Sequence, residues 1–203
     1  MMPKMDGYEF CVRIRETVET SHIPIIMLTA KADMDSKIKG LEQGADAYLI
    51  KPFNKNELLV RIEKLIDGRQ VLKQKYSDPY NSTAIPEKPH SLNEIFFQKI
   101  FKNLEKNYHN EEYGISGLCN DMGISRAQLH RKLIALTNKS ASDFIRYYRI
   151  KKASEMMMNQ DLSVSEIAYQ VGFKDPNYFT KSFVKEIGMT PSEFRSGKTI
   201  LQQ

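Results

Sequence analysis

Two short apolar runs in the first third of the chain have the length of β-strands. They cover residues 23–29 and 47–50, and neither alternates with polar positions. Continuous apolarity is typical of strands that are buried on both faces, as in a parallel sheet. The segments around these runs repeat apolar residues at helical spacing, in the order helix, strand, helix, strand, helix. This order predicts a wound α/β unit.

A proline-rich segment follows this unit. Pro79, Pro86 and Pro89 lie within residues 76–90, among several small polar residues. Proline lacks the backbone N–H that a helix or a central strand needs, so the segment predicts a linker. The expected organisation is therefore a first unit over residues 1–68, a helical extension and linker over residues 69–90, and a second domain over residues 91–203.

The second domain contains a short helix, a glycine turn and a further helix. The short helix covers residues 115–122 and stops at Gly123, and Ser125 then caps a helix over residues 126–137. The apolar stripe of this helix consists of Leu129, Leu133 and Leu136. The order is that of a helix-turn-helix unit, whose second helix enters the major groove of DNA.

The same order recurs after a long helix that runs from about residue 140 to residue 159. Ser163 and Glu166 have the spacing of a capping box, and a turn at Gly172 follows. Asp175 then caps a helix that has Pro176 at its first position. The second domain is therefore expected to be all-α, with two helix-turn-helix units joined by the long helix.

Charge is concentrated around the first of these units. The chain has a formal net charge of +5, yet the stretch from Ser125 to Lys152 alone carries a net charge of +7. Its basic residues are Arg126, Arg131, Lys132, Lys139, Arg146, Arg149, Lys151 and Lys152. The stretch is either a solvated helix face or a surface that faces phosphate groups.

The polar sides of the two second helices carry the candidate DNA contacts. The first exposes Arg126, Ala127, His130 and Arg131, and the second exposes Asn177, Tyr178, Thr180 and Lys181. Side chains of these types reach base edges and phosphates in the major groove.

The segment DLSVSEIAYQVGFKDPNYFTKSFVKEIGMTPSEFR resembles the second helix-turn-helix unit of AraC/XylS-type DNA-binding domains. The resemblance covers residues 98–199, and it implies two recognition helices that read one face of duplex DNA about one turn apart. It implies base contacts from Ala127, His130, Arg131, Asn177, Tyr178 and Lys181. It further implies a phosphate or base contact from Thr180 and a backbone-phosphate contact from Ser163. Ser125 and Arg126 complete the candidate DNA-binding residues.

The first unit resembles the C-terminal half of a response-regulator receiver domain. The motifs that carry the resemblance are MMPKMDGYEFC, IPIIMLTAKAD and GADAYLIKPF. The family uses a phospho-acceptor Asp, a Thr or Ser that turns toward the phosphate, and a Lys that pairs with it. Thr29 and Lys51 match the last two positions, and a hydroxyl and a cation at strand ends suit an aspartyl phosphate.

The acceptor Asp of that family would precede Met1 and is absent from this chain. The chain is therefore expected to be either a truncated gene product or a fragment of a longer one. Residues 1–68 are expected not to receive phosphate in the family's manner, and two strands alone leave an exposed apolar edge.

Several classes of protein are disfavoured. No apolar run has the length of a membrane span, the N-terminus lacks the apolar core of a secretory signal, and Cys11 and Cys119 form no cysteine cluster. A reducing cytoplasm is therefore the expected location. The sequence shows no nucleophile–base set, no glycine-rich phosphate loop and no metal constellation, so neither an enzyme nor a cofactor is expected.

The two resemblances imply a sequence-specific transcription regulator of a two-component phosphorelay. The implied partners are double-stranded DNA, a histidine kinase or upstream hybrid-kinase segments, RNA polymerase and a second copy of the chain. The alternative is a signalling module that acts by protein association through the receiver remnant.

Overall fold

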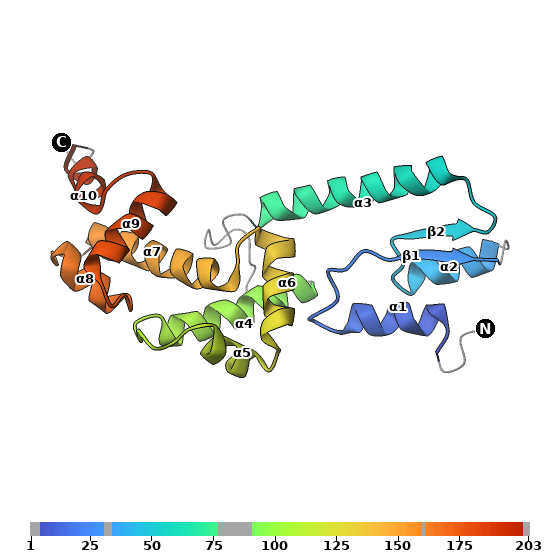
Figure 1. The fold of residues 1–203 in the computed structure, drawn as a ribbon, viewed down its shortest axis with the longest axis horizontal. Coiled ribbons are helices and arrows are strands. Elements are labelled where there is room, and N and C mark those ends of the chain that lie inside the picture. Colours follow the sequence, from blue (N-terminus) through green and yellow to red (C-terminus); the bar gives the residue numbers. More distant parts are fainter. Residues whose placement is uncertain (1–4, 31–33, 77–90, 160, 201–203) are drawn as a thin grey trace. The chain divides into compact units, whose positions relative to one another are not determined.

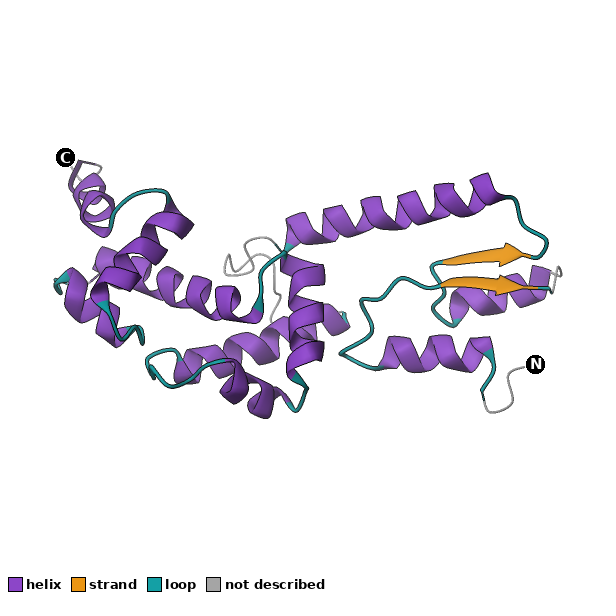
Figure 2. Ribbon diagram, in the orientation of Figure 1, coloured by secondary structure: helices purple, strands orange, loops and turns teal. Residues whose placement is uncertain are grey.

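The computed structural model describes residues 5–30, 34–76, 91–159 and 161–200. Most of them are helical, as Figure 2 shows. The elements of the N-terminal part are α1 (Gly7–Glu16), β1 (Ile26–Thr29), α2 (Met34–Glu42), β2 (Ala47–Ile50) and α3 (Lys55–Lys75). The C-terminal part consists of α4 (Leu92–Asn107), α5 (Ile115–Met122), α6 (Arg126–Thr137), α7 (Ala141–Asn159), α8 (Val164–Gln170), α9 (Pro176–Ile187) and α10 (Pro191–Ile200). The chain divides into two compact units at Phe96–Phe97, with Ala135–Asn138 grouped with the first, and each unit is described by itself.

The expected pair of parallel strands is confirmed in the described part of the chain. β1 and β2 lie side by side (Figure 1), with Ile26 opposite Ala47 and Thr29 opposite Ile50. Arg15 of α1 connects the segments that lead into both strands. Its Nε donates to the carbonyl of Gly44 at 2.7 Å, and its Nη1 donates to the carbonyl of Ile23 at 2.6 Å. The segments that precede β1 and β2 are thus held together by the guanidinium group of Arg15.

The expectation that both strands are buried on both faces is wrong for β1. Met27 lies 3.4 Å from the position that a Cβ on Gly40 of α2 would occupy, so its face of the strand is covered. Leu28 points to the opposite face, because side chains alternate along a strand, and it is 42% exposed. In β2, by contrast, Tyr48 and Leu49 are buried.

Helix α2 is one of the helices expected between the strands, but the apolar residues that recur along it at helical spacing do not face the core. Met34, Ile38 and Leu41 are 66%, 45% and 43% exposed. The side that packs is that of Gly40, where a Cβ would lie 3.0 Å from the ring of Tyr48. Helix α2 can therefore approach β2 closely because glycine has no side chain at position 40. The apolar residues Met34, Ile38 and Leu41 do not make this contact.

Helix α3 starts just after Asn54 and continues through the expected extension. The Asn54 Oδ1 accepts a hydrogen bond from the backbone N–H of Asn56 at 2.7 Å, and the helix runs on to Lys75. The proline-rich linker over residues 77–90 lies outside the described residues. The boundaries drawn at residues 68 and 91 remain a prediction.

Aromatic rings join α4 to the long helix α7 in the C-terminal unit. The ring of Phe101 lies 5.9 Å from that of Phe144 and 5.6 Å from that of Tyr148, between ring centroids. The Ser91 hydroxyl caps the start of α4 by accepting from the backbone N–H of Glu94 at 3.2 Å. This packing ties the first helix of the domain to the connecting helix.

A second core lies among α7, α8 and α9. Its fully buried side chains include Ile150, Ile167, Phe179 and Phe183. The rings of Phe179 and Phe183 are 5.7 Å apart between centroids. No helix among the described residues is long and apolar enough to cross a membrane.

Candidate nucleic-acid interface

The turn between α5 and α6 is built as the sequence predicts. Gly123 ends α5 with a φ of +66°, the left-handed region that glycine adopts at least cost. Ser125 then caps α6 reciprocally with Gln128. The backbone N–H of Gln128 donates to the Ser125 hydroxyl at 3.2 Å, and the backbone N–H of Ser125 donates to the Gln128 Oε1 at 2.8 Å. The first turn of α6 is therefore fixed by local bonds.

Helix α6 separates a buried side from an exposed side. Leu129 and Leu133 are fully buried, and Leu136 is 2% exposed. The predicted contact residues are exposed: Ser125, Arg126, Ala127, His130 and Arg131. The helix thus presents its polar residues from its first turns, the part of a recognition helix that reaches base edges.

The second unit repeats this construction with stronger caps. Ser163 and Glu166 form the predicted capping box at the start of α8. The hydrogen bonds from Ser163 hold the pKa of the Glu166 carboxyl below its usual value. Gly172 follows with a φ of +81°, and the Asp175 side chain caps α9 by accepting from the backbone N–H of Asn177 at 2.8 Å.

Helix α9 exposes three of its four predicted contact residues. Asn177, Tyr178 and Lys181 are exposed, whereas Thr180 is half-buried. The Thr180 hydroxyl donates to the carbonyl of Pro176 at 3.0 Å, so its proton is used within the helix. Tyr178 accepts a hydrogen bond from the Nη1 of Arg146 at 3.2 Å, and no local pattern indicates this partner because it lies 32 residues away in the sequence.

The basic stretch from Ser125 to Lys152 is not one phosphate-facing surface. Lys132 is fully buried, which contradicts its assignment to an exposed charged face. The Lys139 ammonium pairs with Glu186 at 3.1 Å and lies 4.6 Å above the ring of Tyr147. Arg126 and Arg131 are the members of the stretch that the structure places on the exposed side of a predicted recognition helix.

Arg146 and Lys152 of α7 are both paired with carboxylates. Arg146 pairs with Asp143, and the hydrogen bond from Ser140 together with this arginine keeps the pKa of the Asp143 carboxyl below its usual value. Lys152 pairs with Glu105 at 2.8 Å. These charges are neutralised inside the domain and contribute little to a field outside it.

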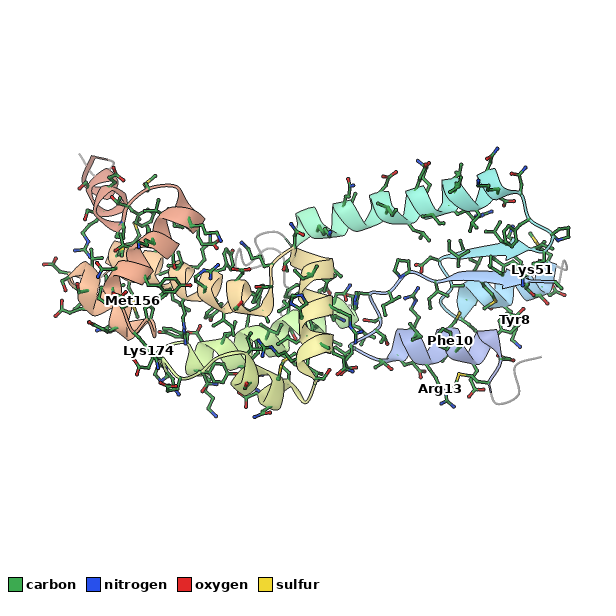
Figure 3. All side chains as sticks on the ribbon, viewed as in Figure 1. Tyr8, Phe10, Arg13, Lys51, Met156 and Lys174 are labelled. Carbon is green, nitrogen blue, oxygen red and sulfur yellow. The ribbon has the colours of Figure 1, made fainter. Side chains whose placement is uncertain are left out.

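Thr29 and Lys51 meet where the two strands end. The backbone N–H of Lys51 donates to the carbonyl of Thr29 at 2.6 Å, and the Lys51–Pro52 peptide bond is cis. Lys51 is exposed and lies just beyond β2 (Figure 3). The pairing of β1 with β2 thus brings the two predicted switch residues to one edge of the sheet.

Comparison with protein families identifies both parts. Residues 1–63 match the response regulator receiver domain, and residues 118–197 match a helix-turn-helix domain. The chain thus joins a segment similar to receiver domains to a segment similar to helix-turn-helix domains.

Known proteins align with different shares of the chain. The "Histidine kinase P4" of Formosa agariphila is 38% identical over 196 residues, which are 97% of this chain and 14% of that protein. The "DNA-binding dual master transcriptional regulator RpaA" of Synechocystis sp. is 38% identical over 104 residues, 50% of this chain and 43% of that protein. The chain thus spans less than half the length of either relative.

A solved structure also aligns with part of the chain. It is the C-terminal domain of the two-component response regulator yesN from Fusobacterium nucleatum. The identity is 28% and the TM-score 0.45, over 48% of this chain and 95% of that one.

Proposed function

We propose that this chain regulates transcription by reading a specific DNA sequence with α6 and α9. The observation that carries the proposal is that both helices follow a tight glycine-containing turn and expose polar side chains from their first turns. In the proposal, Arg131 and Lys181 contact bases or adjacent phosphates, one from each unit. Two such helices in one chain read two half-sites about one helical turn apart.

The other proposed contacts are to base edges and to phosphates. In the proposal, Ala127 and His130 of α6 and Asn177 and Tyr178 of α9 contact base edges. Ser125 and Arg126 lie at the start of α6, next to Ala127. Ser163 is the proposed contact to backbone phosphate, and it lies at the start of α8, where its Oγ accepts from the backbone N–H of Glu166. The Thr180 hydroxyl donates its hydrogen bond to the carbonyl of Pro176. It therefore offers a base an acceptor and a methyl group, and it does not offer a donor to phosphate.

A hydroxyl-radical footprint tests this function. The full chain is bound to a duplex that it has selected from a randomised library, and the protected bases are mapped. We expect two protected segments whose centres lie about 10 base pairs apart on one face of the duplex. One protected segment, or protection that is equal on unselected DNA, would contradict reading by two helices.

Protein association through the receiver segment is the second candidate function. The observation that favours it is the exposure of the apolar residues Met34, Ile38 and Leu41 on α2. Exposed apolar patches often mark protein interaction sites. A chain that acted through association alone would select no duplex and would leave no footprint, so the same experiment separates the two candidates.

We further propose that Thr29 and Lys51 would contact a phosphoaspartate only if another segment supplied it. The support for this proposal is the resemblance of residues 1–68 to the C-terminal half of a receiver domain, because the acceptor position of that family corresponds to a point before Met1. We expect incubation with acetyl phosphate to leave the intact mass of the chain unchanged. A hydroxylamine-sensitive gain of one phosphoryl group would contradict this expectation.

A further inference from the structure

One arginine of α7 lies between the two helix-turn-helix units. The Arg149 Nε donates to the carbonyl of Tyr108 at 3.0 Å, and its Nη2 donates to the carbonyls of Asn110 at 2.8 Å and Tyr113 at 3.0 Å. These three carbonyls belong to the loop that joins α4 to α5. A single planar guanidinium therefore holds the loop that leads into the first unit.

The turn of the second unit packs against the same arginine. A Cβ on Gly172 would lie 2.3 Å from the carbonyl oxygen of Tyr108 and 3.1 Å from the Cζ of Arg149. The Tyr108 ring in turn packs against the core formed by α7, α8 and α9. The α4–α5 loop, Arg149 and the α8–α9 turn thus meet at one point, and residue 172 has no room there for a side chain.

Other contacts across this junction are weaker. Lys174 pairs with Glu112 (Lys174 is labelled in Figure 3), but the two side chains are 59% and 72% exposed, and exposed pairs contribute little. A cavity of about 420 Å³ also opens here, lined by Arg149, Phe173 and Tyr178 among others. Continuous packing therefore does not fill the junction. The contacts that bridge it include the three hydrogen bonds from Arg149 to backbone carbonyls, two of which are part-buried.

We propose that Arg149 is a positioning residue that sets the spacing between the two recognition helices and so lets one chain occupy both half-sites at once. This inference rests on the proposed function. Binding to the second half-site is intramolecular, so its gain in affinity depends on the geometry with which the two sites are presented. Arg149 contacts no DNA in this proposal and acts through the loop and the turn.

The experiment compares the full wild-type chain with Arg149→Met and Arg149→Lys. Three kinds of duplex are used: the selected duplex, the same duplex with one half-site scrambled, and versions with one or two base pairs inserted between the half-sites. We expect both variants to lose about tenfold to 100-fold in affinity on the intact duplex and less than about twofold on the single half-site. We also expect the affinity of both variants to change less than that of the wild type when base pairs are inserted between the half-sites, because the two helix-turn-helix units are no longer held at one distance.

Lys174→Ala is the matched control, since it removes a cation from the same junction but from an exposed pair. It is expected to change affinity by less than about twofold on every duplex. Lysine has one ammonium group and cannot replace a fork that serves three carbonyls, so Arg149→Lys is expected to resemble Arg149→Met.

Several results would overturn the proposal. One is an equal loss of affinity on the intact duplex and on the duplex with a single half-site. Another is a variant whose affinity depends on inserted base pairs as that of the wild type does. A third is that circular dichroism shows both variants to be unfolded. If the wild-type chain selects no duplex or shows no dependence on spacing, the proposed function itself fails, and this result is distinct from the others.

Discussion

The substitution Phe179→Ala is expected to lower the free energy of unfolding of the C-terminal unit by about 3–5 kcal/mol. Phe179 is fully buried, and its ring lies 5.2 Å from that of Phe173 and 5.7 Å from that of Phe183, between centroids. Alanine would remove both aromatic contacts and leave a cavity among side chains that relax only partly. Because folded domains are stable by only about 5–15 kcal/mol, most of the margin would be lost.

Urea denaturation followed by circular dichroism measures this loss. The matched control is Val184→Ala on the same helix, because Val184 is 38% exposed. The control is expected to change stability by less than about 0.5 kcal/mol. Similar effects of the two substitutions would show that α9 does not bury the face described above.

The substitution Arg131→Ala is expected to weaken binding to the selected duplex by about 1–3 kcal/mol and to relax the preference at one base position. Arg131 is exposed on α6, one residue after His130 and on the side opposite the buried leucines. Its guanidinium can donate two parallel hydrogen bonds to the major-groove edge of guanine. Fluorescence anisotropy with the selected duplex and its single-base variants measures both effects.

Arg13→Ala is the control for the loss of a positive charge. Arg13 lies on α1 with a side chain that is 63% exposed, and it pairs with Glu9 at 2.6 Å (Figure 3). We expect this control to leave base preference unchanged. If Arg131→Ala weakened selected and random duplexes equally, Arg131 would be a phosphate contact and not a base contact.

Local signals along the chain predicted the helix starts of the DNA-binding part well. The Ser163–Glu166 capping box and the Asp175–Pro176 start of α9 are both present as expected. Caps depend on atoms within a few residues of one another, so a short stretch of sequence contains the whole interaction. Gly123 likewise predicted the end of α5, because its left-handed φ is a local requirement.

Charge was a poorer guide than capping. The +7 stretch suggested one phosphate-facing surface, yet Lys152 pairs with Glu105, which lies far away in the sequence. Lys132 is fully buried. A count of charges gives their sign and density, but it does not say which carboxylates or carbonyls come from other helices to neutralise them.

Local patterns in the sequence are enough to predict the helices and their caps, the parallel pair of strands, and the two turn-and-helix units that present Arg131 and Lys181. These features follow from backbone preferences and from apolar spacing, which act over one element at a time. Long-range packing, in contrast, sets which cations stay exposed, brings α2 against β2 through Gly40, and places Arg149 and Gly172 at one junction. These outcomes depend on contacts between residues that are distant in the chain, and no local pattern encodes such contacts.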